Sequence, residues 1–227
     1  MKIKPLHSWR ISPRQAVQLQ SRFAGKVSLA PRRRPPKIVA GADIGFARDS
    51  SAAFAGVVLL AFPSLRVIGE FVHEGEIEFP YVPGLLSFRE APILLQLFGK
   101  IDPAPDLIFF DGHGLAHPRR LGLASHLGLF LNRSTIGCAK SKLIGVYDEP
   151  EDAKGAFTGL LDGHNRVLGT VLRSRRGCKP IFVSVGHKVG LSQAIEWTLQ
   201  CTTRYRIPEP TRLAHNLVTK CRKSGSS

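Results

Sequence analysis

A run of glycine, histidine and arginine that follows a short apolar segment places the strongest constraint on what this chain can form. Residues 107–110 read Leu-Ile-Phe-Phe, and such a segment is typical of a buried β-strand. Residues 111–120 follow as Asp-Gly-His-Gly-Leu-Ala-His-Pro-Arg-Arg, so Asp111 stands where the strand ends. Open α/β sheets place ligand sites at strand ends that lead into loops of this kind. A carboxylate among basic side chains favours a divalent cation that holds a phosphate.

The charge balance predicts a polyanionic partner. The 227 residues include 32 Lys and Arg against 17 Asp and Glu, which gives a formal net charge of +15. A folding-competent chain with this excess most often binds nucleic acid, and a ribosomal-type or membrane-surface protein is the alternative. Because 43% of the residues are hydrophobic, we expect one large domain over residues 1–222, followed by a disordered tail over 223–227.

Cysteine spacing and hydropathy predict the cellular environment. The four cysteines show no C-x-x-C spacing, so we expect reduced thiols rather than a zinc site. No apolar run approaches the length of a membrane span, and the first residues lack the apolar core of a signal peptide. We therefore expect a soluble, cytoplasmic protein without membrane association, monomeric by default.

Apolar periodicity and capping residues predict a mixed sheet with helices on its faces. A three-strand meander is followed by alternating helices and strands, which is typical of an α/β domain. Ser12 and Pro13 are typical of a helix start, and Ser192 is predicted to cap a later helix that ends at Leu199. The expected helices cover residues 13–24, 86–99, 121–131, 193–199 and 208–220, and the expected strand structure covers 38–46, 52–62, 65–78, 107–110, 135–139, 156–173 and 181–185.

Two more acidic residues are candidates for a cation site. Asp43 interrupts an apolar strand, and a buried carboxylate is expensive unless it is paired or binds a metal. The structural alternative is a strand-end aspartate that caps a turn before Gly45. Glu90 stands three residues after Ser87, a spacing that by itself favours a helix capping box. Two or three carboxylates with several retained waters are the ligands that Mg²⁺ prefers.

Two further segments carry features of an enzyme that acts on nucleic acid. Residues 79–84 form an aromatic turn bracketed by prolines, which hold it stiff enough to wedge between stacked bases. The alternative is an ordinary strand-to-helix connection in which Tyr81 is half buried. Lys140 follows a predicted strand and could neutralise charge on a phosphate, with a solvated surface lysine as the alternative.

Several of these segments resemble sequence blocks of the endonuclease V family, the deoxyinosine 3′-endonucleases. Residues 80–90 are similar to its PYxPG…FRE segment, and residues 111–126 are similar to its DGHG…HPRR…SH block. The matches run in order from about residue 10 to residue 216, and several blocks at consistent spacing are far more specific than one motif. Further similarity covers residues 39–46, 135–140, 186–187 and 206–212.

The resemblance implies an α/β, ribonuclease H-like fold in which a mixed five-stranded sheet is flanked by helices. In that fold the first strand lies beside the fourth, so Asp43 and Asp111 are expected to converge. The resemblance also implies that Asp43, Glu90 and Asp111 bind Mg²⁺, with Mn²⁺ as an alternative ion, and this overrides the capping interpretation of Glu90. His215 falls on a fourth metal-site position, and Lys140 is a candidate catalytic residue in a further matching block.

The activity that the resemblance implies is DNA repair at deaminated adenine. The second phosphodiester bond 3′ to deoxyinosine is expected to be hydrolysed, leaving a 3′-hydroxyl and a 5′-phosphate. His117 and His126 are expected to contact the strand or support the site, and satisfied structural histidines are the alternative. The expected DNA wedge consists of Pro80, Tyr81, Val82 and Pro83, and the expected lesion pocket is lined by Gly84, Leu86 and Gly112.

Two other functions remain open from the sequence. Some members of this family prefer inosine in single-stranded RNA, and a few contacts to the 2′-hydroxyl decide between RNA and DNA. A catalytically silent nucleic-acid-binding protein would need the positive charge but not the carboxylates. The presence of Asp43, Glu90 and Asp111 together argues against that second alternative.

Overall fold

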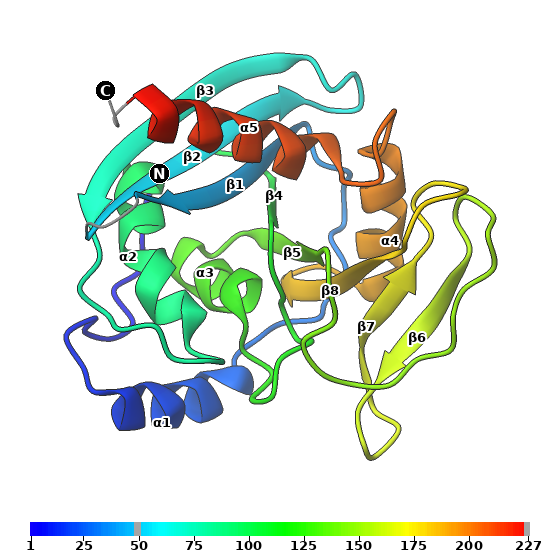
Figure 1. The fold of residues 1–227 in the computed structure, drawn as a ribbon, viewed down its shortest axis with the longest axis horizontal. Coiled ribbons are helices and arrows are strands. Elements are labelled where there is room, and N and C mark those ends of the chain that lie inside the picture. The colour runs from blue at the N-terminus through cyan, green and yellow to red at the C-terminus, as the bar shows by residue number, and fades with distance from the viewer. Residues whose placement is uncertain (48–50, 225–227) are drawn as a thin grey trace.

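The computed structural model describes residues 1–47 and 51–224, and an eight-stranded mixed sheet runs through its centre (Figure 1). The strand order is β3-β2-β1-β4-β5-β8-β7-β6. β4 pairs in parallel with β1 and with β5, whereas the other neighbouring pairs are antiparallel. The strands are β1 (Ile38–Phe46), β2 (Ala52–Ala61), β3 (Val67–Glu76), β4 (Leu107–Phe110), β5 (Ser134–Ala139), β6 (Phe157–Leu161), β7 (Val167–Leu172) and β8 (Ile181–His187).

Helices cover both faces of the sheet. α2 and α3 pack on one face, whereas α4 and α5 pack on the other, where α5 lies across β1 and β2 (Figure 1). Ser12 caps α1 through reciprocal hydrogen bonds with Gln15, and Pro13 occupies its first position, as predicted. Within the described residues, no helix is both long and apolar enough to cross a membrane. The helices are α1 (Pro13–Ala24), α2 (Leu86–Gly99), α3 (Leu123–Leu131), α4 (Leu191–Gln200) and α5 (Glu209–Ser224).

The central strand β4 is buried on both sides because it separates two hydrophobic cores. Leu107 and Phe109 belong to the core that includes α4 and α5, whereas Ile108 and Phe110 belong to the core that includes α2 and α3. Successive side chains of a strand point to opposite faces, so a strand between two cores is apolar at every position. Asp111 continues this alternation and therefore falls on the α5 side of the sheet.

Glycines on β1 let α5 approach the sheet closely. A Cβ atom added to Gly41 would lie 1.8 Å from the backbone oxygen of Pro210, at the start of α5. One added to Gly45 would lie 2.5 Å from a methyl carbon of Val218. Asp43 lies midway between these two glycines, so it shares their face of the strand. The face of β1 that admits the helix is therefore the face that carries the carboxylate.

The structure confirms a mixed sheet flanked by helices with β1 beside β4, and it changes three details. The five strands that the resemblance implied are β3, β2, β1, β4 and β5, and β8 pairs with β5 to extend the sheet by three more. α4 begins before Ser192, because the Gln193 side chain accepts a hydrogen bond from the Gly190 N–H and closes the first turn there. α5 continues to Ser224, so the predicted tail begins inside a helix, and residues 225–227 lie outside the described residues.

Gly41→Ala tests the close packing of α5 on β1. We expect this change to lower the free energy of unfolding by about 1–3 kcal/mol, because the added methyl group must push the helix away from the strand. Gly25→Ala is the matched control, since no heavy atom lies within 4 Å of the added Cβ and its φ of −68° suits alanine. Urea unfolding measures both variants. Equal stability of the two would mean that α5 does not lie this close to β1.

Candidate functional site

Two carboxylates meet where β1 and β4 run side by side. In the parallel register Ala42 pairs with Phe110, so Asp43 and Asp111 are the next residues on their two strands. Both face α5, and their side chains are only 14% and 18% exposed. Two like charges this close and this shielded from water repel each other, so the pair requires a positive partner.

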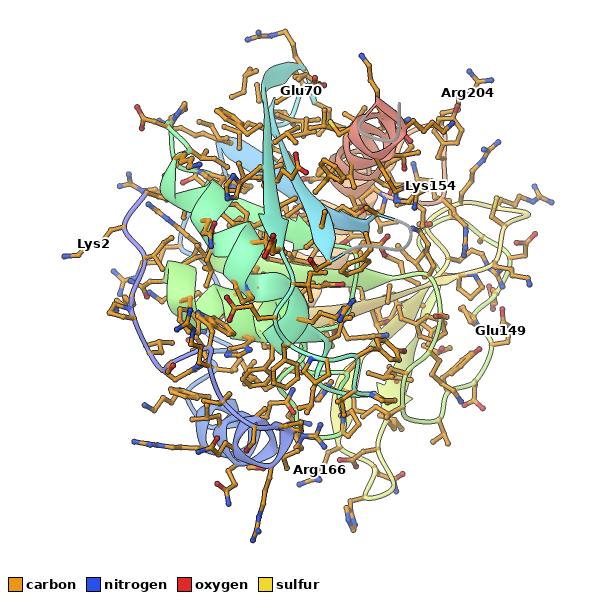
Figure 2. The ribbon with its side chains drawn as sticks, turned by 60° about the vertical axis from the view of Figure 1, so that its left-hand side comes forward. Lys2, Glu70, Glu149, Lys154, Arg166 and Arg204 are labelled. Carbon is orange, nitrogen blue, oxygen red and sulfur yellow. The ribbon has the colours of Figure 1, made fainter. Side chains whose placement is uncertain are left out.

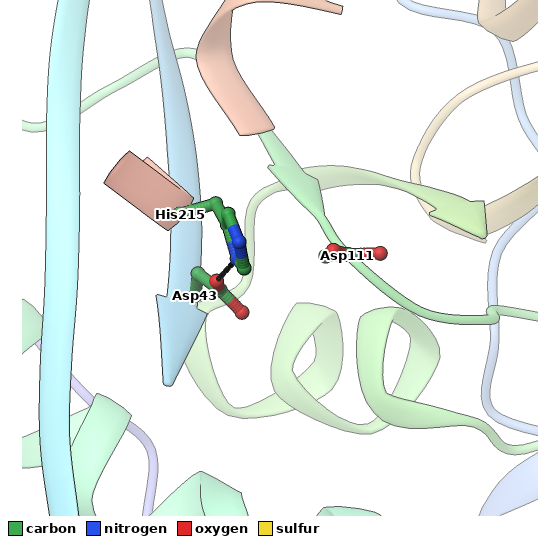
Figure 3. Close-up of side chains that lie close together, drawn as sticks. All are labelled: Asp43, Asp111 and His215. Atoms are coloured by element: carbon green, nitrogen blue, oxygen red, sulfur yellow. Dashed lines mark hydrogen bonds and ion pairs between the residues drawn. The ribbon is translucent and has the colours of Figure 1, made fainter. Parts of the chain in front are cut away.

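His215 on α5 completes a three-residue cluster with these carboxylates (Figure 3). Its Nδ1 donates a hydrogen bond to Oδ2 of Asp43 at 2.8 Å. In the tautomer with the proton on Nδ1, Nε2 has a free lone pair and can act as a ligand. One ligand atom from each of Asp43, Asp111 and His215 lies within 4.8 Å of the other two. The geometry therefore groups three of the four residues that the sequence analysis assigned to the metal.

Lys140 lies directly beside this cluster, one residue beyond β5. Its Nζ donates to Oδ2 of Asp111 at 2.5 Å. β5 is the neighbour of β4, so the ammonium group reaches the carboxylate across the parallel strand pair. The structure therefore pairs this exposed lysine with the acidic cluster.

Glu90 lies outside the three-residue cluster but responds to it electrostatically. It projects from α2 and is 6% exposed. Burial, and to a smaller extent the negative charges of Asp43 and Asp111, raise its pKa to about 8. The predicted capping box is wrong, because Ser87 lies inside the first turn of α2 and its hydroxyl pairs with Nδ1 of His126 at 2.9 Å instead.

The donor set fits a hard divalent cation. Burial also raises the pKa of Asp43, the hydrogen bond from His215 lowers it, and the charge of Asp111 raises it again. The pKa values of Asp43 and Glu90 are raised mainly because burial disfavours their charged forms, and a bound cation would favour those forms again. Carboxylate oxygens are the ligands of Mg²⁺ and Mn²⁺, and the single imidazole is the weaker partner.

A pocket of about 290 Å³ lies next to the cluster, because Gly112 and His113 follow Asp111 in the chain and line it. Its other walls come mainly from the turn at residues 79–84, here called the wedge turn, from α1 and from the loop after β5. Tyr81 at the tip of the turn is 73% exposed, which corrects the half-buried alternative. The residues predicted for the pocket or wedge that line this cavity are Tyr81, Val82, Pro83, Gly84, Leu86, Gly112 and His117, whereas Pro80 is exposed and outside the lining.

The two histidines assigned to strand contacts have different surroundings. His117 lines the pocket, and its Nε2 donates to the Gly84 oxygen at 2.9 Å. Burial lowers the pKa of His117 to about 4, so it is neutral at physiological pH. His126 is fully enclosed, with Nδ1 on Ser87 and Nε2 on Nε2 of His7 at 2.8 Å. It supports the start of α2 from the interior and has no surface with which to contact a strand.

Three residues at this site carry no role in the sequence analysis. Gln20 on α1 lines the pocket and is buried, and Arg119 bonds both to it and to Gly84. His113 also lines the pocket, and its Nδ1 is buried without a hydrogen-bond partner among the described residues. Arg119 and His113 stand inside the motif at 111–120, which signals their region, whereas nothing near Gln20 in the sequence distinguishes it from an ordinary helical residue.

Comparison with known proteins decides the family. A sequence model described as endonuclease V matches residues 21–216. This chain belongs to the endonuclease V family. It is 49% identical over 216 residues to the endonuclease V of Dehalococcoides mccartyi, covering 95% of this chain and 96% of that protein. It is 46% identical over 222 residues to the endonuclease V of Gloeobacter violaceus, covering 96% and 90%. As a member of this family, the protein is a nuclease.

Solved structures of the endonuclease V family have the same fold. The crystal structure of endonuclease V from Streptomyces avermitilis superposes with a TM-score of 0.92 at 39% identity and covers 100% of both chains. Endonuclease V of Ciona intestinalis was solved in complex with a 24-mer DNA that contains an inosine followed by a ribo-adenosine. It matches with a TM-score of 0.82 at 30% identity and covers 93% of this chain and 98% of that one. The ribonuclease H-like fold expected for this family is thus confirmed.

The raised pKa of Glu90 makes the stability of the metal-free protein depend on pH. Its pKa of about 8 in the folded state exceeds the ordinary value of 4.5, so the unfolded chain loses this proton first as the pH rises. The free energy of unfolding of the wild type therefore decreases as the pH rises from 4.5 to about 8. Glu90→Gln does not titrate, so we expect its free energy of unfolding to exceed that of the wild type by a margin that grows with pH.

Urea unfolding in EDTA at several pH values between 4.5 and 8 measures this margin. Glu70→Gln, on the exposed side of β3, is the control. A margin that does not change with pH would show that Glu90 ionises as it does in water.

Proposed function

We propose that this protein is a Mg²⁺-dependent endonuclease of DNA repair. It recognises deoxyinosine and hydrolyses the second phosphodiester bond 3′ to it, leaving a 3′-hydroxyl and a 5′-phosphate. Membership of the endonuclease V family supports the nuclease activity, and the complex of the Ciona relative supports inosine-containing DNA as the substrate. The observation that carries the proposal is that one loop, starting at Asp111, supplies both a carboxylate of the acidic cluster and a wall of the pocket.

The side chains of the cluster have separate tasks in this proposal. Asp43 and Asp111 would hold the cation, with Glu90 behind them and His215 orienting Asp43 through its hydrogen bond. A divalent ion bound there supplies Lewis-acid stabilisation of the charge that builds up on the phosphate and the leaving oxygen. The Lys140 ammonium group, which donates a hydrogen bond to Asp111, is close enough to offset further negative charge on the reacting phosphate.

The pocket supports recognition of a base flipped out of the helix. The Gly84 oxygen is already occupied by three donors, so the group that this residue offers to a ligand is its N–H. A backbone N–H donates a hydrogen bond to the carbonyl oxygen of hypoxanthine, whereas adenine presents an amino group, itself a donor, at that edge. Two donors that face each other remain unpaired, which costs about 1–3 kcal/mol when buried.

Basic side chains on the outside of the molecule support binding to the nucleic-acid backbone. Lys2, Lys154 and Arg204, labelled in Figure 2, come from segments far apart in the chain, and all three are exposed. Together with the net charge of +15, they favour phosphate contacts beyond the site itself. The affinity for DNA should therefore weaken as the salt concentration rises.

Cleavage of a duplex that carries one deoxyinosine tests the proposal. We expect wild-type protein with Mg²⁺ to nick the strand one nucleotide beyond the inosine, and EDTA to abolish the nick. Asp111→Asn should lower the rate by about 10³-fold or more, because it removes a charge that holds the cation. Asp102→Asn, an exposed carboxylate before β4, is the matched control. Cleavage by Asp111→Asn at the wild-type rate would contradict the proposal.

A matched inosine-containing single-stranded RNA, assayed in parallel, distinguishes the RNA alternative. If RNA is cleaved and DNA is not, the protein is an inosine-specific endoribonuclease with the same cation site. If neither is cleaved although DNA still binds, the catalytic proposal is wrong.

Tyr81→Ala tests the wedge. The side chain projects from a stiff turn, so its loss should raise KM for duplex substrate about tenfold or more by removing contact with stacked bases. Single-stranded substrate needs no strand separation and serves as the internal control, with a smaller change expected. An equal effect on both substrates would mean that Tyr81 does not separate strands.

A further inference from the structure

The turn between the wedge and α2 is held by one carbonyl group that collects three hydrogen bonds. The Gly84 oxygen accepts from Nε2 of His117 at 2.9 Å and from Nη2 of Arg119 at 2.9 Å. It also accepts from Nε2 of Gln20 at 3.0 Å. A carbonyl oxygen has two lone pairs, so this group is fully occupied. Gly84 has a φ of +76°, a left-handed conformation that glycine adopts readily, and this conformation allows the carbonyl to meet its donors.

The three donors also hold one another. Nε of Arg119 donates to Oε1 of Gln20 at 2.5 Å, and the backbone N–H of Arg119 donates to Nδ1 of His117 at 3.2 Å. The Gln20 amide nitrogen also donates a hydrogen bond to the backbone oxygen of Leu121 at 3.1 Å. The result is a closed network that joins α1, the loop after β4 and the wedge turn. A network whose members are all satisfied and largely buried is rigid.

The other end of the wedge turn is fixed independently. Nη1 of Arg89 on α2 donates to the Phe79 oxygen at 2.9 Å, and the Phe79 ring is buried. Leu85, just after Gly84, is buried in the same cluster. Tyr81 projects between these two anchors. The turn is therefore held at both ends, with its exposed tip over the pocket.

We propose that Gln20 and Arg119 are positioning residues for base recognition, which act by holding the Gly84 carbonyl. They fix the wedge turn and the pocket wall before substrate arrives, so binding need not order them. This rests on the proposed function, because it takes the pocket as the site of the extruded base. Neither side chain is assigned to the acidic cluster, so their loss should weaken substrate binding rather than slow the chemical step.

Two variants remove parts of the network. Arg119→Lys keeps the positive charge but loses the planar group that bonds to Gly84 and Gln20 together. Gln20→Met keeps the length of the side chain and removes its hydrogen bonds. Arg173→Lys is the matched control, because Arg173 is a buried arginine that also bonds to backbone oxygens, those of Glu151 and Pro150.

Hydrogen exchange in the free protein tests the network without any substrate. We expect amides of residues 79–86 to exchange about tenfold faster in Arg119→Lys and Gln20→Met, as loss of a charged or buried hydrogen bond implies. Exchange of residues 107–111 should stay at the wild-type rate, and Arg173→Lys should leave both segments unchanged. Unchanged exchange of residues 79–86 in both variants would overturn the proposal.

Steady-state cleavage of the deoxyinosine duplex tests the consequence for recognition. We expect KM to rise about tenfold in each variant while kcat stays within about twofold, with the double variant close to the single ones because both act on one carbonyl. A fall in kcat at constant KM, or the same KM rise in Arg173→Lys, would overturn the positioning role. If wild-type protein cleaves no inosine substrate, the proposed function fails, and the exchange measurement still decides whether the network holds the turn.

Discussion

The parallel pairing of β1 with β4 is the constraint on which the rest of the site depends. It brings the ends of two strands from distant parts of the chain together, and strand alternation turns Asp43 and Asp111 to the same face. Neither strand carries a positively charged side chain. The side chains that offset the two charges therefore come from neighbouring elements: His215 from α5 and Lys140 from the end of β5.

This arrangement separates the source of stability from the source of function. The two hydrophobic cores on either side of β4 stabilise the sheet, and β4 itself is apolar at every position. At its end the same strand carries a charge cluster whose burial raises the pKa values of Asp43 and Glu90. Glycines in β1 allow α5 to close over the cluster, so the packing that stabilises the sheet also supplies the histidine. A rigid scaffold can hold groups in a geometry that they would not adopt alone.

Recognition relies on a different kind of contact. The pocket walls are mostly loops and the first turns of helices, and hydrogen bonds to single backbone groups help to hold them in place. The Gly84 carbonyl shows this clearly, because it ties one turn to α1 and to the loop after β4. His126 acts from the interior through a side chain instead, because its Nδ1 pairs with the Ser87 hydroxyl at the start of α2. His117 thus supports Gly84 at the end of the wedge turn, and His126 supports Ser87 at the start of α2, which follows it.

The sequence by itself determined the elements and the chemistry of the site. Long periodic segments such as α1 and β1 were predictable because side-chain period and capping residues act locally, and Asp43 and Asp111 stood out as charges at the ends of apolar strands. Resemblance to endonuclease V added His215, which no local pattern indicates, and assigned Glu90 to the metal site, whereas its spacing from Ser87 suggested a cap that the structure does not show. Only the tertiary structure decided that the last three strands extend the same sheet, that His126 is buried and that a network forms around Gly84. The physical reason is that hydrogen bonds and burial join residues distant in the chain, whereas the sequence displays only what neighbouring residues favour.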